Sequence, residues 1–178
     1  MGINNGLGAV GTWVVDASVA FTWFAAVPDS AQAALLLEPH WQHVLIAPDL
    51  ILVELLNAGW KSRRLGAITD QQLAWLANRA REPFNELFKP DMLLSRAHHW
   101  CTTLDHPAYD CLYIALAEMT NATLISADQR LLRKLQDNHP GVPKSLPLSL
   151  LARFEAVAAS SQSSSEGPWS REALHERG

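Results

Sequence analysis

Short apolar runs alternate with longer stretches of helical periodicity along most of the chain. The runs predict strands at 13–16, 43–47, 86–89, 123–126 and 146–148. The stretches between them predict helices at 18–26, 29–37, 49–64, 69–81, 91–104, 107–120 and 128–138. Strands that alternate with helices form parallel sheets with helices packed on their faces. The pattern therefore predicts an α/β fold with a mostly parallel central sheet of four to five strands.

Local signals support several of the helix starts. Thr69 is followed three residues later by Gln72, the spacing of a capping box, and Pro107 suits the first position of a helix. Three aspartates next to predicted helix starts are interpreted as helix caps, namely Asp49, Asp91 and Asp105.

Changes in composition divide the chain into three parts. Residues 1–12 are rich in Gly and Asn and predict a flexible lead-in, and residues 13–154 carry the strand and helix pattern of one domain. Residues 155–178 are rich in Ser and cannot bury enough apolar surface to offset the entropy of ordering, which predicts a disordered tail. Gly6, Gly8 and Gly11 have the spacing of a dinucleotide-binding loop but precede a strand, so the context of that motif is missing.

Composition indicates a single compact domain in a reducing compartment. The chain has 178 residues, of which 48% are hydrophobic and 18% are charged, and this is enough to bury a sizeable core. Two cysteines are too few for a disulfide framework, so we expect a cytoplasmic protein. No segment reaches about 18 uncharged apolar residues, so we expect no membrane span.

The charge is unevenly distributed. The net charge is −4, yet no Lys or Arg precedes Lys61, and residues 61–100 carry more basic than acidic residues. A basic face could meet the phosphates of a nucleic acid, although a solvated helix surface explains the same residues equally well. The candidate phosphate contacts are Lys61, Arg63, Arg64, Arg130 and Arg133.

Four acidic residues lie where an apolar run meets a turn or a helix. Asp16 closes the first predicted strand, Glu54 interrupts an apolar helix, Asp110 follows Pro107, and Asp128 follows the strand at 123–126. Carboxylates in apolar surroundings must be hydrogen-bonded or bound to metal, because an unpaired buried charge costs several kcal/mol. Carboxylate oxygens suit Mg²⁺ or Mn²⁺, so the four residues are candidates for one metal site.

Each acid also has a structural explanation that the sequence leaves open. Asp16 could form a turn between strand and helix, and Glu54 could lie on a solvent face opposite Leu50, Val53 and Leu56. Asp110 lies in the first turn of a helix, where the helix dipole favours a negative charge, and Asp128 is a suitable N-cap.

The sequence segments around the four acids resemble those of one protein family. The segments Val-Val-Asp16-Ala-Ser18, Val-Glu54-Leu-Leu-Asn57, His-Pro-Ala-Tyr-Asp110 and Leu-Ile-Ser126-Ala-Asp128 resemble, in order, those of PIN-domain ribonucleases, and most of all the VapC toxins of toxin–antitoxin pairs. The resemblance implies a three-layer α/β/α sandwich. It also implies a metal site for Mg²⁺ or Mn²⁺ at Asp16, Glu54, Asp110 and Asp128, supported by Ser18, Asn57 and Ser126.

The same resemblance implies a function and partners. Such a protein is an endoribonuclease that hydrolyses phosphodiester bonds with a divalent metal and leaves 5′-phosphate and 3′-hydroxyl ends. A cognate antitoxin and a homodimer are the expected partners, besides RNA. The apolar runs at 19–24 and 33–37, with Leu55, Leu56 and Trp60, predict a groove for an antitoxin helix.

Three other functions compete with this one. A cysteine or histidine hydrolase would draw on Cys101, Cys111, His98, His99 and His106, but no nucleophile motif surrounds either thiol. An aspartyl-phosphate enzyme would need a second aspartate two residues after Asp16, where Ser18 stands. A non-catalytic RNA- or protein-binding module with the same fold is the third, and RNA cleavage that depends on metal would separate it from a nuclease.

Overall fold

Five parallel strands form one central sheet. The computed structural model describes residues 11–26, 29–38, 43–136 and 141–151. The strands are β1 Thr12–Val15, β2 Val44–Pro48, β3 Glu86–Phe88, β4 Thr123–Ser126 and β5 Ser145–Pro147, in the order β3-β2-β1-β4-β5. The five predicted strands are confirmed to within one residue. Most of the predicted lead-in and all of the predicted tail lie outside the described residues.

Helices connect the strands as the periodicity predicts. They are α1 Ala17–Ala20, α2 Ser30–Ala34, α3 Ile51–Arg64, α4 Asp70–Arg79, α5 Leu94–Leu104, α6 Ala108–Thr120 and α7 Gln129–Gln136. The predicted helix at 18–26 is shorter in the structure, because it tightens into a 3₁₀ turn at Phe21–Trp23.

The caps differ in part from the prediction. Thr69 and Gln72 form the predicted capping box, with both of its hydrogen bonds present. The three aspartates interpreted as caps do not act as such, because neither α3, α5 nor α6 has a side-chain cap. Asp105 instead ends α5 in the left-handed conformation, with φ of 45°, which Asp tolerates better than most residues and which turns the chain sharply towards α6.

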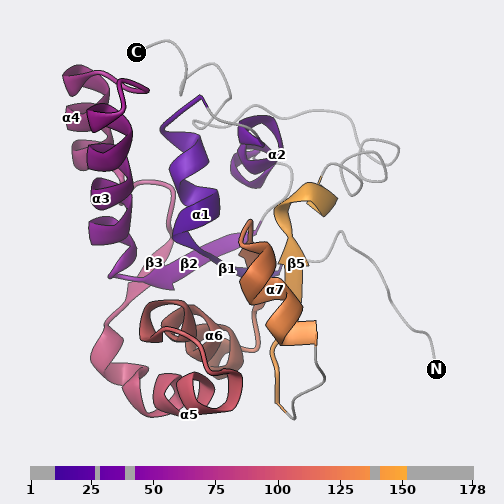
Figure 1. Ribbon diagram of the computed structural model, residues 1–178. Coiled ribbons are helices and arrows are strands. Elements are labelled where there is room, and N and C mark those ends of the chain that lie inside the picture. The colour runs from indigo at the N-terminus through magenta and orange to yellow at the C-terminus, as the bar shows by residue number, and fades with distance from the viewer. Residues whose placement is uncertain (1–10, 27–28, 39–42, 137–140, 152–178) are drawn as a thin grey trace, which may run out of the picture.

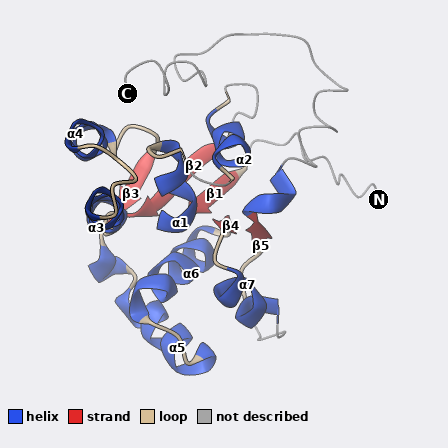
Figure 2. Cartoon of the chain, turned by 45° about the horizontal axis from the view of Figure 1, so that its top comes forward, coloured by secondary structure: helices blue, strands red, loops and turns tan. Residues whose placement is uncertain are grey.

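The helices cover both faces of the sheet. Figure 1 shows α1, α3 and α4 above the sheet and α5 and α6 below it, and the turned view in Figure 2 shows the same separation. The strand order explains this arrangement, because the chain moves outward from β1 to β3 and then crosses back to β4. Crossovers between parallel strands are nearly always right-handed, so a reversal of direction places the helices on the other face. The predicted α/β/α layering is confirmed.

The core centres on α6. This helix packs against β1, β2, β4 and α5, and its residues 111–117 are all buried. A helix that is apolar on every side belongs inside a protein. By contrast, none of the described helices is both long and apolar enough to cross a membrane.

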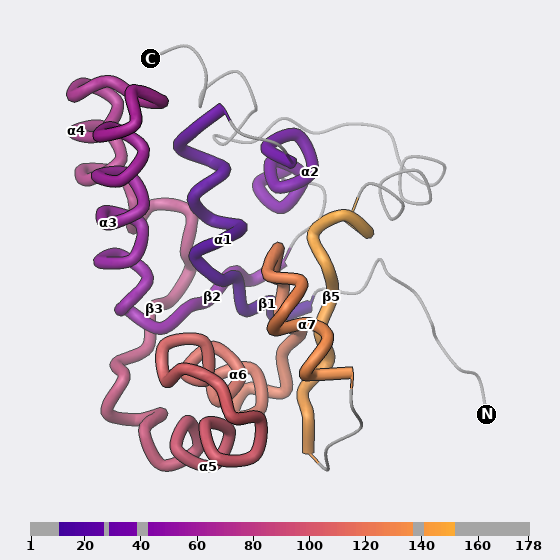
Figure 3. The backbone as a smooth tube through the Cα atoms, in the orientation of Figure 1, coloured from indigo at the N-terminus to yellow at the C-terminus, as the bar shows by residue number. Residues whose placement is uncertain are grey.

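The order of the strands creates a switch point between β1 and β4. These two strands are neighbours, with Val15 opposite Ile125, but the chain leaves β1 towards α1 and leaves β4 towards α7. Figure 2 labels β1 and β4 side by side in the sheet, although they lie far apart in sequence. The tube in Figure 3 shows α1 leaving β1 on the upper side of the sheet, opposite α5 and α6. Ligands of open α/β sheets bind at the carboxyl ends of strands at such a point.

Candidate active site

Asp16 lies directly after β1, at the switch point. Its backbone N–H donates to Ile125 of the neighbouring strand, at 3.2 Å, and its side chain is buried. The carboxylate accepts three hydrogen bonds: Ser18 Oγ donates at 2.6 Å, the Val19 N–H at 3.1 Å, and Ser126 Oγ from β4. The Val19 contact also caps α1, so Asp16 has a structural role between strand and helix, as an N-cap.

The electrostatics of Asp16 are dominated by burial. Loss of solvent raises the pKa of its carboxyl from the ordinary value to about 6, and the charge of Asp110 adds to the rise. The hydrogen bonds from Ser126, Ser18 and Val19 oppose this rise but do not cancel it. The charged carboxylate is therefore held against a cost that a cation would remove.

Two serines link Asp16 to the backbone of Ala127 and Asp128. Ser126 Oγ accepts the Asp128 N–H at 2.9 Å, and Ser18 Oγ accepts the Ala127 N–H at 3.0 Å. Asp128 Oδ1 in turn accepts the N–H groups of Arg130 and Leu131, at 2.7 and 3.2 Å, so the N-cap interpretation of Asp128 is correct. One oxygen of Asp128 is thus used by α7, and the other is not used by the described residues.

Glu54 reaches the same region from the first turn of α3. The alternative that placed it on a solvent face is wrong, because Val53 and Leu56 are 64% and 45% exposed whereas Glu54 is half-buried. The buried face of α3 is formed by Ile51, Leu55 and Gly59, next to which Glu54 projects inward. The hydroxyl of Tyr113 donates a hydrogen bond to Glu54 Oε2.

Asp110 enters the site from the first turn of α6. His106 Nε2 lies 2.8 Å from Asp110 Oδ2, and the imidazole is buried whereas 35% of the Asp110 side chain is exposed. The contact is short but lacks the alignment of a hydrogen bond, so it is an electrostatic contact. Burial raises the pKa of Asp110, His106 opposes the rise, and Asp128 adds to it.

The acids act on one another. Asp110 raises the pKa values of Asp16 and Glu54, Asp16 raises that of Glu54, and Asp128 raises that of Asp110. For both Asp16 and Glu54 burial is the largest cause. Like charges are thus gathered at the carboxyl edge of the sheet.

The donor set suits a cation that keeps several of its waters better than one that needs a closed cage of protein ligands. No three described His, Cys, Asp or Glu side chains form a ready-made ligand group. Mg²⁺ keeps several waters and takes only one or two carboxylates directly, so a loose group of acids is compatible with it. The structure therefore brings the four predicted acids into one region without closing them into a cage.

Comparison with known proteins shows the family of this chain. A family model for the PIN domain matches residues 13–137, which span all four acids. The chain belongs to the PIN-domain family. A crystal structure of PAE2754 from Pyrobaculum aerophilum is similar, with a TM-score of 0.60 and 23% sequence identity over 85% of this chain and 99% of that one. At this identity the likeness shows the fold alone, and a search of curated proteins gave no match.

The basic candidates around this PIN domain differ in their availability. Arg130 is exposed and close enough to lower the pKa of Asp110. Arg63 is paired with Asp70, at 2.5 Å, and Arg133 Nε donates to the Gln129 carbonyl. Lys61 and Arg64 are exposed at the end of α3. Arg130 is therefore the predicted phosphate contact that lies nearest the acids.

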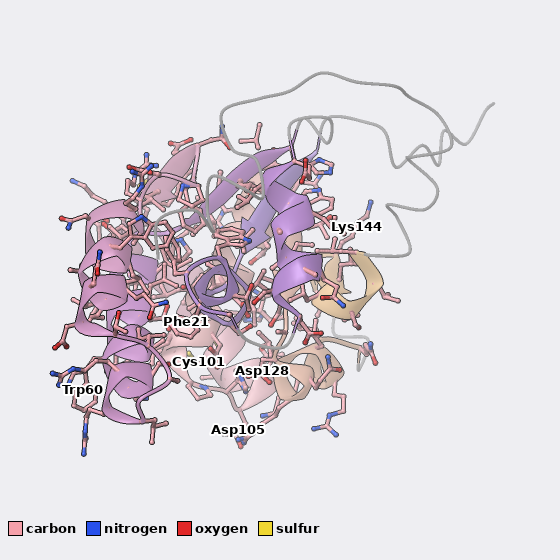
Figure 4. The ribbon with its side chains drawn as sticks, turned by 90° about the horizontal axis from the view of Figure 1, so that it is seen from above. Phe21, Trp60, Cys101, Asp105, Asp128 and Lys144 are labelled. Atoms are coloured by element: carbon pink, nitrogen blue, oxygen red, sulfur yellow. The ribbon has the colours of Figure 1, made fainter. Side chains whose placement is uncertain are left out.

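Other predicted features of the PIN domain fall partly outside the site. Asn57 is exposed and makes no hydrogen bond to the described residues, so nothing in the structure supports the role expected for it. The apolar runs expected to form a groove lie mainly in the core, with Val19, Ala20 and Trp23 buried. What stays exposed is the stripe Val53, Leu56 and Trp60 on α3, and Figure 4 shows Trp60 at the outer edge of that helix.

The thiol alternative does not fit the geometry. Burial raises the pKa of Cys111 to about 12, so its thiol is protonated and a poor nucleophile. Its sulfur faces the backbone carbonyl of His106 rather than the imidazole. His98 and His99 are exposed on α5.

Three contributors were missed from the sequence. Tyr113 lies three residues after Asp110 on α6, and residues at this spacing share a helix face, which is the signal that could have found it. His106 lies in the turn before α6, so helix spacing could not have found it. Lys134 is the third, and its Nζ donates to the carbonyls of Leu104 and Asp105, at 2.6 and 2.5 Å. Lys134 thereby holds the turn that leads into His106 and α6.

Proposed function

We propose that this PIN domain is a divalent-metal-dependent endoribonuclease that hydrolyses phosphodiester bonds. The observation that carries the proposal is the gathering of Asp16, Glu54 and Asp110 at the switch point of the sheet, where Asp110 raises the pKa of both Asp16 and Glu54 and Asp16 adds to the rise for Glu54. Such mutual repulsion is tolerated where a cation offsets it. Asp128 is the fourth member, with one oxygen available for metal or for water.

The residues of the site have different roles in the proposed reaction. When bound, Mg²⁺ or Mn²⁺ supplies a Lewis acid and a water of lowered pKa. Asp16 is the metal ligand with the most fixed position, because three hydrogen-bond donors hold its carboxylate. Asp110 is partly exposed and faces the side from which RNA arrives. Arg130 contacts a phosphate beside the scissile bond. By family resemblance the products carry 5′-phosphate and 3′-hydroxyl ends.

The biological role we propose is that of a toxin in a toxin–antitoxin pair. The ordered resemblance of the four acidic segments to VapC toxins supports this role. A toxin of this kind acts on RNA in the cytoplasm and is silenced by an antitoxin that covers the acids. The exposed stripe Val53, Leu56 and Trp60 supports an interface with another protein, and we propose a homodimer in addition to the antitoxin complex.

Cleavage of a defined RNA pool with and without metal tests the enzymatic proposal. We expect cleavage in Mg²⁺ or Mn²⁺, loss of cleavage with a chelator, and recovery when metal is returned. Asp110→Asn should reduce the rate by at least about 100-fold, since it removes a group that acts on the reacting centre. The exposed Asp91→Asn is the matched control and should cut at the parent rate.

Two results would contradict the proposal. Cleavage that persists in chelator, or that is equal in Asp110→Asn and the parent, rules out the metal mechanism. Binding of RNA without any cleavage favours the non-catalytic module instead. Co-purification with the product of the adjacent gene, together with the mass of the free protein in solution, tests the antitoxin and the homodimer separately.

A further inference from the structure

Glu54 is held in a different way from the other acids of the site. Asp16 accepts three hydrogen bonds and Asp128 accepts two from backbone N–H groups, whereas Glu54 accepts one, from the phenol of Tyr113. It lies in the first turn of α3, with no capping contact to hold it. Within the described residues, the position of its carboxylate therefore depends on Tyr113.

The packing around Tyr113 fixes the orientation of its hydroxyl group. Tyr113 is 1% exposed and lies on α6, where its neighbours Leu112 and Ile114 are also buried. A buried aromatic ring is fixed by its packing, so its hydroxyl points in one direction, and a buried phenol needs a hydrogen-bond partner. Glu54 Oε2 provides that partner.

The surrounding charges would otherwise drive Glu54 away. Asp110 and Asp16 both repel it, and a glutamate side chain gains rotamer freedom when it moves into solvent. The hydrogen bond from Tyr113 opposes both tendencies, and it lowers the pKa of Glu54 against the rise caused by burial. Tyr113 also lies three residues after Asp110, so one face of α6 carries an acid of the site and the donor that holds a second acid.

We propose that Tyr113 is a positioning residue, whose hydroxyl holds the Glu54 carboxylate towards Asp16 and Asp110 so that it is in place before a divalent cation binds. This inference rests on the proposed metal-dependent function and adds a residue to it. Tyr113 touches neither metal nor RNA, and it acts through Glu54.

Metal binding to Tyr113→Phe tests the proposal. Phenylalanine fills the same space and lacks only the hydroxyl, so the core stays packed. The probe is Mn²⁺, titrated by electron paramagnetic resonance on the full chain without RNA. Groups that orient a metal ligand are typically worth about 10-fold or more in affinity, so we expect the Kd for Mn²⁺ to rise about 10-fold.

The chain offers a matched control. It has two tyrosines, and the other, Tyr109, is on the same helix and 62% exposed. Tyr109→Phe should leave the Kd for Mn²⁺ unchanged. In a Glu54→Gln background, Tyr113→Phe should cause little further loss, because contributions that act through one group are not additive.

Each outcome decides the question. A parent that binds Mn²⁺ and a Tyr113→Phe variant with the same Kd overturn the positioning role and leave the proposed function standing. An equal further loss in the Glu54→Gln background shows that Tyr113 acts by another route and also overturns it. A Tyr113→Phe variant that fails to fold shows a purely structural role, and a parent that binds no divalent metal removes the proposed function and this inference together.

Discussion

The two sides of the site hold their carboxylates by different means. On the β1–β4 side, Asp16 is buried and receives hydrogen bonds from two serines and a backbone N–H. On the α3–α6 side, Glu54 and Asp110 are only partly buried, and each relies on one neighbour, Tyr113 or His106. On the β1–β4 side, called the strand side below, the position of the carboxylate is therefore fixed by several hydrogen bonds. On the α3–α6 side, called the helix side, the position of each carboxylate depends on a single contact.

The two sides also differ in how much burial destabilises their charged carboxylates. The rise in the pKa of Asp16 comes mainly from burial, so its cost persists even with its donors in place. The acids of the helix side are nearer to solvent, which screens their mutual repulsion. We therefore expect Asp16 to contribute most to the pH dependence of the metal-free protein, and the carboxylates of the α3–α6 side to move more readily when a cation binds.

The largest effect we expect is the pH dependence caused by Asp16. Its pKa of about 6 lies above the ordinary value, so its contribution to stability is complete below about pH 4 and is lost as the pH rises through 6. The loss is on the order of 3 kcal/mol. The pKa of His43 is lowered to about 4, mainly by burial, so His43 titrates in the same range with the opposite sign.

A comparison of variants isolates Asp16 from His43. The free energy of unfolding of Asp16→Asn minus that of the parent, measured by denaturant in chelator, should increase from pH 4 to pH 7.5. The His43 contribution cancels in this difference. If the difference is independent of pH, the buried charge of Asp16 is not the main cost on the strand side.

The second effect concerns the two serines of the strand side. Ser126→Ala removes a buried donor to Asp16 and leaves the Asp128 N–H without its acceptor, so we expect a loss of about 2 kcal/mol in the free energy of unfolding. Ser18 is partly exposed, and water can replace it, so Ser18→Ala should cost about 1 kcal/mol.

Denaturant unfolding at pH 7.5 tests this ranking. The exposed Ser95→Ala on α5 is the control and should stay within about 0.5 kcal/mol of the parent. Equal losses for Ser126→Ala and Ser18→Ala would show that burial of the donor does not matter here.

The strand side was also the more predictable side from sequence. Asp16 and Ser126 adjoin strands, and the ends of neighbouring parallel strands must meet at one edge of the sheet, so local pattern was enough to place them. The five strands themselves followed from apolar runs bounded by turn residues, and their bounds are confirmed to within one residue.

The helix side was less predictable, because it depends on how α3 and α6 are rotated. The apolar spacing of α3 suggested Leu50, Val53 and Leu56 as its buried stripe, but the helix buries Ile51, Leu55 and Gly59 instead. Periodicity alone cannot separate a stripe that packs in the core from one that stays on the surface. For the same reason the contact between Tyr113 and Glu54 could not be derived from the sequence, although the spacing of Tyr113 from Asp110 was visible.

The smallest effect we expect is that of Asp110→Asn on the metal-free protein. Burial and Asp128 disfavour the charged form of Asp110 more than His106 and Arg130 favour it, as the raised pKa shows. A neutral isostere should therefore leave the free energy of unfolding at pH 7.5 unchanged or raise it, by no more than about 1 kcal/mol because solvent screens a partly exposed group.

The exposed Asp91→Asn is again the control. With Mg²⁺ in excess, the parent should gain stability that Asp110→Asn does not. If Asp110→Asn loses more than about 1 kcal/mol without metal, then His106 and Asp110 form a stabilising ion pair, and the helix side is held by the fold as firmly as Asp16 is.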